Sequence, residues 1–167
     1  MSTTTSKAIR ERIATVVAAL VPTLHAEKPF VSYLDASGAD FRRWVRAHPE
    51  VCTRRFQART VATSQGDVSN TDVSARLATF DLIVAYAQRW RAGQSFDRDD
   101  TMEADQILLE RAIGRDGYGN FALAHPNASW LSPDASGSQT GTSFERDVGG
   151  VDFLVVRQTM RFYRSAT

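Results

Sequence analysis

The sequence has very little cysteine and no long apolar run. Cys52 is the only cysteine among 167 residues, so the chain cannot form an intramolecular disulfide bond. This argues against a disulfide-rich secreted domain. No apolar run approaches the roughly 20 residues that a membrane-spanning helix needs. The first residues, MSTTTSK, lead into an amphipathic segment rather than the apolar stretch of a signal peptide, so we expect a chain made in the cytoplasm.

A strong net charge is also missing. The formal net charge is +1, so we expect no strong overall attraction to nucleic acid or to an anionic membrane. The charges are unevenly placed, because residues 1–60 hold ten Lys/Arg against five Asp/Glu, whereas residues 61–167 hold ten against fourteen. Such a dipole favours head-to-tail association of copies, although chance produces asymmetries of this size more often than function does.

Length and composition predict one globular domain over residues 1–167. The hydrophobic fraction of 43% and the charged fraction of 23% are ordinary for a folded protein. A chain of this length buries a core without disulfides or metals. No segment repeats, which excludes a solenoid.

Two helices are expected in the first third of the chain. Apolar residues recur at helical spacing over residues 6–21, with Ser6 as the expected N-cap and Pro22 as the stop. A second, short helix is expected within residues 38–48. Its apolar residues face inward and its arginines face solvent.

A third helix is expected over about residues 100–113. Asp100 and Glu103 have the spacing of a capping box, and Gly114 follows as a C-terminal glycine. Its expected apolar surface consists of Met102, Ile107, Leu108, Leu109, Ala112 and Ile113.

The remaining pattern predicts strands and two long loops. Strands are expected over residues 28–34, 52–62, 77–90, 120–124, 144–148 and 151–163. The last strand is the richest in β-branched and aromatic residues, and we expect it to be buried on both faces at its start. Polar loops are expected near residues 63–75 and 125–143, and Gly149-Gly150 suits a two-residue hairpin turn. The fold class is therefore α+β: a mainly antiparallel sheet with an N-terminal helix and a second helix packed on it.

No residue pattern predicts catalysis or metal binding. His25, His48 and His125 lack the spacing of a zinc site, and Cys52 has no identifiable base partner in the sequence. We therefore predict that the chain is not an enzyme and holds no metal and no cofactor.

The densest acidic cluster lies at the start of the third predicted helix. It lacks the glycine and the terminal glutamate of a calcium-binding loop. Acidic side chains suit the positive end of a helix dipole, so an ordinary helix start explains them well. The cluster consists of Asp97, Asp99, Asp100, Glu103 and Asp105.

The order and size of these elements resemble the tail terminator (tail completion) proteins of long-tailed bacteriophages and related small neck proteins. The matching layout is an N-terminal amphipathic helix, a strand pair with a long intervening loop, a helix, and a closing strand that ends in basic and aromatic residues. These elements are residues 8–20, 56–62, 80–86, 101–113 and 154–164, whereas residues 22–50 and 125–143 have no counterpart in the layout.

The resemblance implies a structural virion protein that is assembled in the host cytoplasm. Its subunits would form a ring, commonly a hexamer, that caps the tail tube, stops its polymerisation and joins it to the neck or head. Implied partners are other copies of the chain, the tail tube protein, a neck or connector protein and, in contractile tails, a sheath protein. Genomic DNA would pass through the lumen without specific binding. The two predicted loops are candidates to become ordered on contact with these partners.

The resemblance also implies sites on the surface of the subunit. We expect the acidic cluster to line the lumen or to face a partner. The residues expected at contacts between subunits are Arg42, Arg43 and Arg46 of the short helix, and Arg157, Arg161 and Tyr163 of the closing strand.

Two other functions remain open on sequence grounds. A small ligand-binding domain or enzyme with a pocket between sheet and helices predicts a buried polar group among Asp81, Tyr86, His125 and Arg157. A nucleic-acid-binding module predicts salt-sensitive binding of DNA. Its arginines would be Arg42, Arg43, Arg46, Arg54, Arg55 and Arg59.

Overall fold

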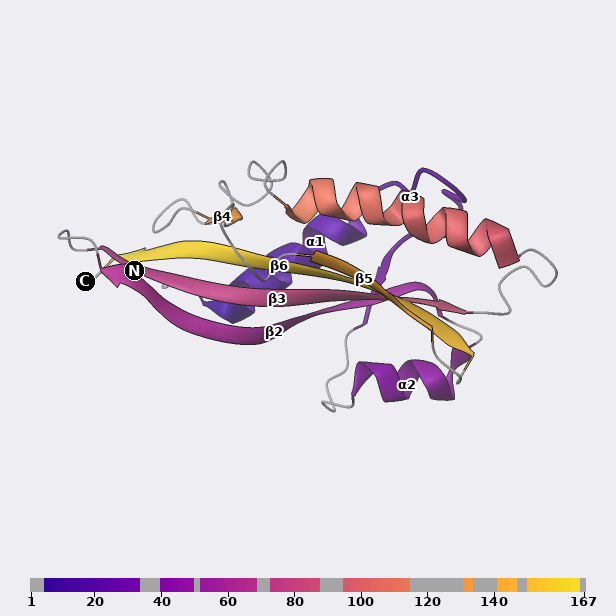
Figure 1. The fold of residues 1–167 in the computed structure, drawn as a ribbon, viewed down its shortest axis with the longest axis horizontal. Coiled ribbons are helices and arrows are strands. Elements are labelled where there is room, and N and C mark those ends of the chain that lie inside the picture. The colour runs from indigo at the N-terminus through magenta and orange to yellow at the C-terminus, as the bar shows by residue number, and fades with distance from the viewer. Residues whose placement is uncertain are drawn as a thin grey trace.

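The predicted α+β fold is confirmed by the computed structural model, which is drawn in Figure 1. The structure describes residues 5–33, 40–49, 52–68, 73–87, 95–114, 131–133, 141–146 and 150–165. Within these ranges the elements follow the order α1-β1-α2-β2-β3-α3-β4-β5-β6. The buried hydrophobic side chains form one cluster that draws on residues from Ile9 to Met160.

Helix α1 spans Ser6–Ala18 and buries the apolar stripe that its sequence predicts. The N-cap is Thr5 rather than the predicted Ser6, because the Thr5 hydroxyl oxygen accepts a hydrogen bond from the Ala8 amide at 3.1 Å. The predicted end at residue 21 was too late. The last fully buried position is Val17, and beyond it the helix has no further apolar side chain to pack deeply into the core.

Helix α2 spans Phe41–Ala47 and confirms the short predicted helix. The Asp40 carboxylate accepts a hydrogen bond from the Arg42 amide at 3.2 Å, and Phe41 and Val45 are buried. Strand β1, in contrast, spans only Val31–Ser32 and is shorter than the predicted strand over residues 28–34.

Helix α3 spans Ser95–Ile113, so it begins five residues before the predicted capping box. Asp100 lies inside the helix and does not cap it, which makes that part of the prediction wrong. The first turns are instead held by an ion pair between Arg98 and Asp152, with an N–O distance of 3.1 Å. Residue Asp152 is far away in the sequence, so the local pattern could not indicate this contact.

The sheet is mainly antiparallel, as predicted. The long strands are β2 (Thr53–Val68), β3 (Val73–Ala87) and β6 (Val151–Ser165). The strand order is β1-β2-β3-β6-β4, and β5 also pairs with β6. The short strands β4 and β5 span Leu131–Pro133 and Gly141–Glu145. Among the strands that the structure describes, only the pairing of β1 with β2 is parallel.

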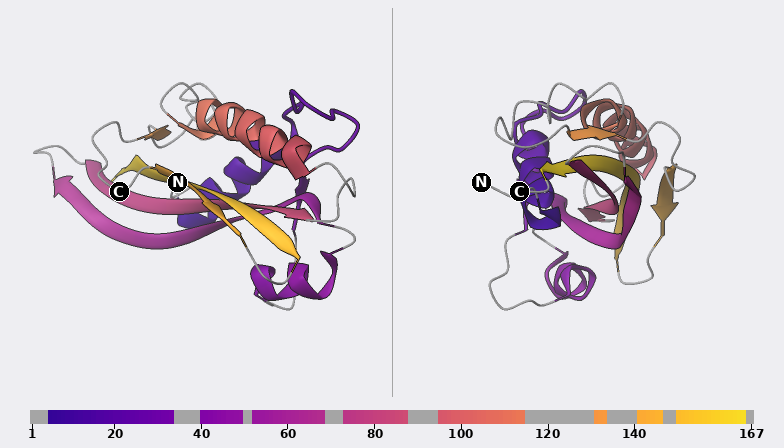
Figure 2. Two further views of the ribbon diagram at one scale, coloured as in Figure 1. Left: turned by 45° about the vertical axis from the view of Figure 1, so that its right-hand side comes forward. Right: turned by 90° about the vertical axis from the view of Figure 1, so that its left-hand side faces the viewer.

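Helices cover both faces of this sheet. Helix α1 packs against β2 and α3, and α3 packs against β6, so α1 and α3 share one side. Helix α2 lies on the other side, as Figures 1 and 2 show. Leu154 and Val156 of β6 face the α3 side, whereas Phe153 and Val155 face the α2 side. All four are buried, which confirms that the closing strand is buried on both faces at its start.

The three long strands continue past the helices as an arm, which extends to the left in Figure 1 and curves in Figure 2. We define the arm as residues 63–68 of β2, 73–77 of β3 and 161–165 of β6. The predicted loop at 63–75 is therefore wrong, because residues 63–68 and 73–75 lie in strands. Strand β3 is hydrogen-bonded to β2 on one edge and to β6 on the other as far as the Val73–Ser165 pair. This pairing on both edges gives hydrogen-bond partners to the backbone groups of β3 along the arm.

The second predicted loop is also partly wrong. Residues 131–133 and 141–143 lie in β4 and β5, while the rest of residues 125–140 and the predicted strand at 120–124 lie outside the described part. The antiparallel pairing of β5 with β6 is confirmed, with Glu145 opposite Phe153. The predicted two-residue turn at Gly149-Gly150 includes residue 149, which lies outside the described part, so it stays a prediction.

Gly114 permits a close approach at the end of α3. A Cβ atom on Gly114 would lie 2.3 Å from the Glu110 carbonyl oxygen, whereas a Cβ on the exposed Gly141 would meet nothing within 4 Å. We expect Gly114→Ala to lower the free energy of unfolding by about 1–3 kcal/mol, as overpacking does. Urea denaturation measures the change. Gly141→Ala is the matched control. Equal stabilities of the two variants would contradict the close approach of Gly114 to the Glu110 carbonyl oxygen.

Candidate functional site

The predicted interface arginines lie on the α2 side of the sheet. Arg157 and Arg161 are an even number of residues from Phe153 in β6, so all three share one face. The Arg42 guanidinium lies 4.8 Å from the centre of the Phe153 ring, which places α2 over that face. We call this surface the basic face. Its arginines are Arg42, Arg43 and Arg46 of α2, Arg55 and Arg59 of β2, and Arg157 and Arg161 of β6.

One buried carboxylate neutralises part of the basic face. Asp81 of β3 accepts two hydrogen bonds from Arg157, of 2.7 and 2.9 Å, and lies 3.7 Å from Arg59. These hydrogen bonds raise the pKa of Arg157. Two cations therefore share a single carboxylate, and the face keeps a surplus of positive charge.

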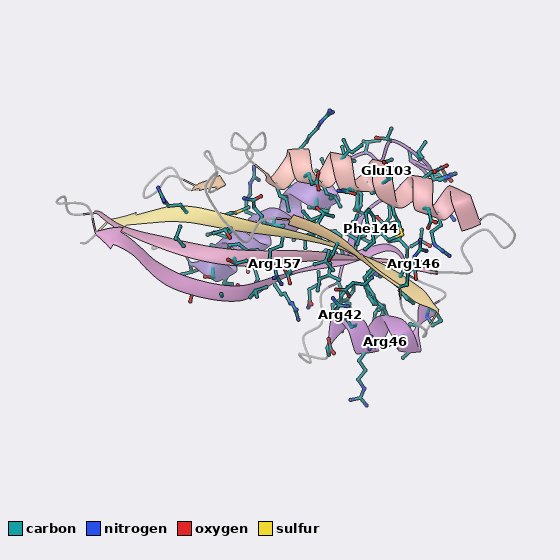
Figure 3. The ribbon with its side chains drawn as sticks, in the orientation of Figure 1. Arg42, Arg46, Glu103, Phe144, Arg146 and Arg157 are labelled. Carbon is teal, nitrogen blue, oxygen red and sulfur yellow. The ribbon has the colours of Figure 1, made fainter. Side chains whose placement is uncertain are left out.

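Arg42 is held in place, whereas its neighbours on α2 extend outward. The Arg42 guanidinium donates a hydrogen bond to Glu145 of β5, and this bond raises the pKa of Arg42. Arg43 and Arg46 are exposed, and Figure 3 shows Arg46 pointing away from the body of the protein. The sixth predicted contact residue, Tyr163, pairs with Ala75 at the end of β6, and its side chain lies outside the described part.

The predicted acidic cluster is divided by the fold. Asp99, Asp100 and Glu103 are exposed on α3, on the opposite side of the sheet from α2. Asp105 is fully buried, so its assignment to a lumen or partner surface was wrong. It lies on the same helix stripe as Met102 and Leu109, which face the core. The side chain of Asp97 lies outside the described part.

Asp105 belongs instead to a buried triad with Arg54 and Tyr86. Arg54 donates two hydrogen bonds to the carboxylate, of 2.6 and 3.0 Å, and the Tyr86 hydroxyl donates a third of 2.6 Å. Burial raises the pKa of Asp105 and, together with the charge of Asp105, raises the pKa of Tyr86 well above its usual value. The triad links β2, β3 and α3 through the core.

Arg54 also fixes the segment that follows α1. Its guanidinium donates hydrogen bonds of 2.6–2.8 Å to the backbone carbonyls of Leu24, His25 and Lys28. Arg54 itself has a φ of 58°, in the left-handed region, at an irregularity in the β2–β3 register. Sequence reasoning missed this residue as a core element, because its partners are 26 to 51 positions away.

A second group of charges anchors the start of α3 to β5 and β6. The fully buried carboxylate of Asp152 lies 2.8 Å from Arg146 and 3.1 Å from Arg98. Arg146 also donates a 2.6 Å hydrogen bond to Asp99, which raises the pKa of Arg146. One carboxylate oxygen of Asp99 is therefore already bound by Arg146. Asp100 and Glu103 are exposed on the same helix.

The structure places some residues of each alternative function as that function requires and others not. Arg54 is buried, so its place in the nucleic-acid hypothesis is wrong. Asp81 and Tyr86 are buried as a ligand-binding domain would require, but Arg157 and Asp105 already bind them. His125 lies outside the described part, and the ligand-binding alternative stays a prediction.

The comparisons leave the family open. No protein-family model matches the sequence, and no curated protein matches it. Among the described residues, no group of three or more His, Cys, Asp or Glu side chains is placed to hold a metal ion. Within the same ranges, none of the helices is both long enough and apolar enough to cross a membrane.

Proposed function

We propose that this chain is the subunit of a ring that caps the tail tube of a long-tailed bacteriophage. The ring would stop polymerisation of the tube and offer a docking surface to the neck or head. Such an activity is physical rather than chemical, because each subunit uses two different surfaces that become occupied when the ring closes.

The arm is the observation that carries the proposal. Three paired strands extend beyond all the helices in Figure 1, and the β2 residues at its base, Val61, Ala62 and Thr63, are exposed. Val61 is 42% exposed although it is β-branched and apolar. A ribbon of paired strands that extends past the helices offers a surface beyond the helix-covered part of its own subunit. It supplies a surface that reaches a neighbouring molecule, as assembly proteins require.

The separation of charges supports the same proposal. Arginines gather on the α2 side of the sheet, whereas exposed carboxylates gather on α3 on the opposite side. A subunit with unlike surfaces on opposite sides associates head to tail, and head-to-tail contacts generate rings or filaments.

The mass of the purified protein in solution tests the proposal. We expect light scattering to give a multiple of the 18.5 kDa chain mass, with six copies as the main species, and negative-stain microscopy to show rings. Where the free protein is monomeric, rings are expected at the ends of added tail tubes from the parent phage. A monomer that ignores these tubes would contradict the proposal.

A further inference from the structure

The outer face of α3 carries a stripe of acidic residues around one exposed apolar side chain. Asp100, Glu103, Ile107 and Glu110 recur at helical spacing, and all four are exposed. The exposed Arg111 borders this stripe in the last turn of the helix, and the three carboxylates leave the stripe with a net negative charge. Ile107 is 48% exposed, against the prediction that it would be buried. We call these four residues the acidic patch.

Strand β5 runs beside this patch and adds a second exposed apolar side chain. Thr142 donates a hydrogen bond to Glu110, and Arg146 donates one to Asp99 near the start of the helix. Phe144 lies midway between these two contacts and is 48% exposed (Figure 3). Exposed large apolar side chains bordered by charges are typical of a protein interface, with an apolar centre and a polar rim.

The outer face of α2 presents the opposite charge. The helix sequence FRRWVRA contains no acidic residue, and Arg43 and Arg46 are both exposed. Phe41 and Val45 anchor the helix in the core, and Arg42 ties it to Glu145. We call Arg43 and Arg46 the basic patch, which stands on a fixed helix and needs little ordering to bind a partner.

The two patches of one subunit cannot meet, because the sheet lies between them (Figures 1 and 2). We infer that the basic patch of one copy binds the acidic patch of the next copy in the ring. This inference rests on the proposed function and names the subunit contact within it. A second copy fits as the occupant because it supplies the complementary charge on a different surface, which makes the contact heterologous.

Charge reversal tests this contact. Arg43→Glu/Arg46→Glu makes both patches acidic, and Asp100→Arg/Glu103→Arg makes both patches basic. We expect each variant alone to assemble at least about tenfold more weakly than the natural chain, because like charges then face each other. A mixture of the two variants is expected to restore rings in which they alternate, and light scattering and negative-stain microscopy measure both results.

A matched control separates this contact from a general charge effect. Lys7→Glu changes one exposed residue on α1, outside both patches, by the same charge as Arg46→Glu. We expect Lys7→Glu to leave assembly unchanged. All variants should keep the melting temperature of the natural chain, since every substituted side chain is exposed.

The possible outcomes distinguish the inference from the proposed function. Rings of the natural chain that survive both reversals would overturn the inference and leave the ring in place. Variants that fail alone and also fail when mixed would assign the patches to another partner, such as the tube protein, and would likewise overturn it. A natural chain that forms no ring, with or without tubes, would overturn the proposed function itself.

Discussion

Replacing Arg54 with methionine is expected to lower the free energy of unfolding by about 3–5 kcal/mol, the cost of breaking a buried ion pair from one side. Arg54 and Asp105 are both fully buried, so the substitution leaves a carboxylate without its main partner. The backbone carbonyls of Leu24, His25 and Lys28 lose their donor as well. Urea denaturation followed by circular dichroism measures the change.

An exposed arginine provides the control for this prediction. Arg59 is half exposed and lies 3.7 Å from Asp81, which keeps its two hydrogen bonds to Arg157. We expect Arg59→Met to cost less than about 1 kcal/mol, the usual range for surface ion pairs. If Arg54→Met lowers the free energy of unfolding by no more than Arg59→Met does, the buried triad does not stabilise the core.

The effect of Arg54→Met should also depend on pH. Burial raises the pKa of Asp105 in the folded chain above its value in the unfolded chain. The contribution of Asp105 to stability is therefore fully present below the unfolded pKa. That contribution is lost as the pH rises through the folded pKa. Arg54 lowers the pKa of Asp105, and its removal raises that pKa further. We therefore expect the loss of stability in Arg54→Met to be smaller at pH 5 than at pH 8. If Arg54→Met loses the same stability at both pH values, the charge of Asp105 is not the cause of that loss.

Shortening the arm is expected to abolish assembly while the subunit still folds. Ser64 pairs with Leu77, so residues 65–76 can be replaced by Asn-Gly, a sequence that favours a two-residue hairpin turn. The buried residues from Ala78 onward are all retained. We expect the shortened chain to be monomeric by light scattering, with a melting temperature within about 5 °C of the natural chain, because the change removes none of the side chains that the structure describes as buried. Rings formed by the shortened chain would show that the arm is not part of the subunit contact.

The sequence was most informative where the pattern is local. The spacing of Ile9, Ile13 and Val17 predicted α1, and the composition of the closing strand predicted the doubly buried β6. Both depend on short-range periodicity that burial imposes on a helix or a strand. The fold class followed from the order of such elements.

Contacts between distant residues were harder to predict. Asp105 occupies a core-facing position between Met102 and Leu109, and this placement was the available signal for a buried charge. Its partner Arg54 lies 51 positions earlier in the chain, in a strand with several other arginines. Residues 63–75 were predicted as a loop for a similar reason, because their sequence is polar and the β3 part of the arm pairs with β6, which is distant in the sequence.

Exposed surfaces were predicted only in part. The arginines of α2 and the carboxylates of α3 were expected at contacts, and the fold places these two groups on opposite sides of the sheet. Ile107 was not expected at a surface. The helical pattern assigned Ile107 to the core, but the helix turns that position outward.

The length of tail tubes assembled in the presence of this protein tests its proposed function most directly. Tube protein encoded in the same genome would be polymerised with and without the purified chain, and tube lengths measured by negative-stain microscopy. We expect tubes that stop growing when the chain is added, with a ring at one end, and continued growth with the shortened-arm variant. Tubes that grow to the same length with the natural chain as without it would contradict a role in tail completion.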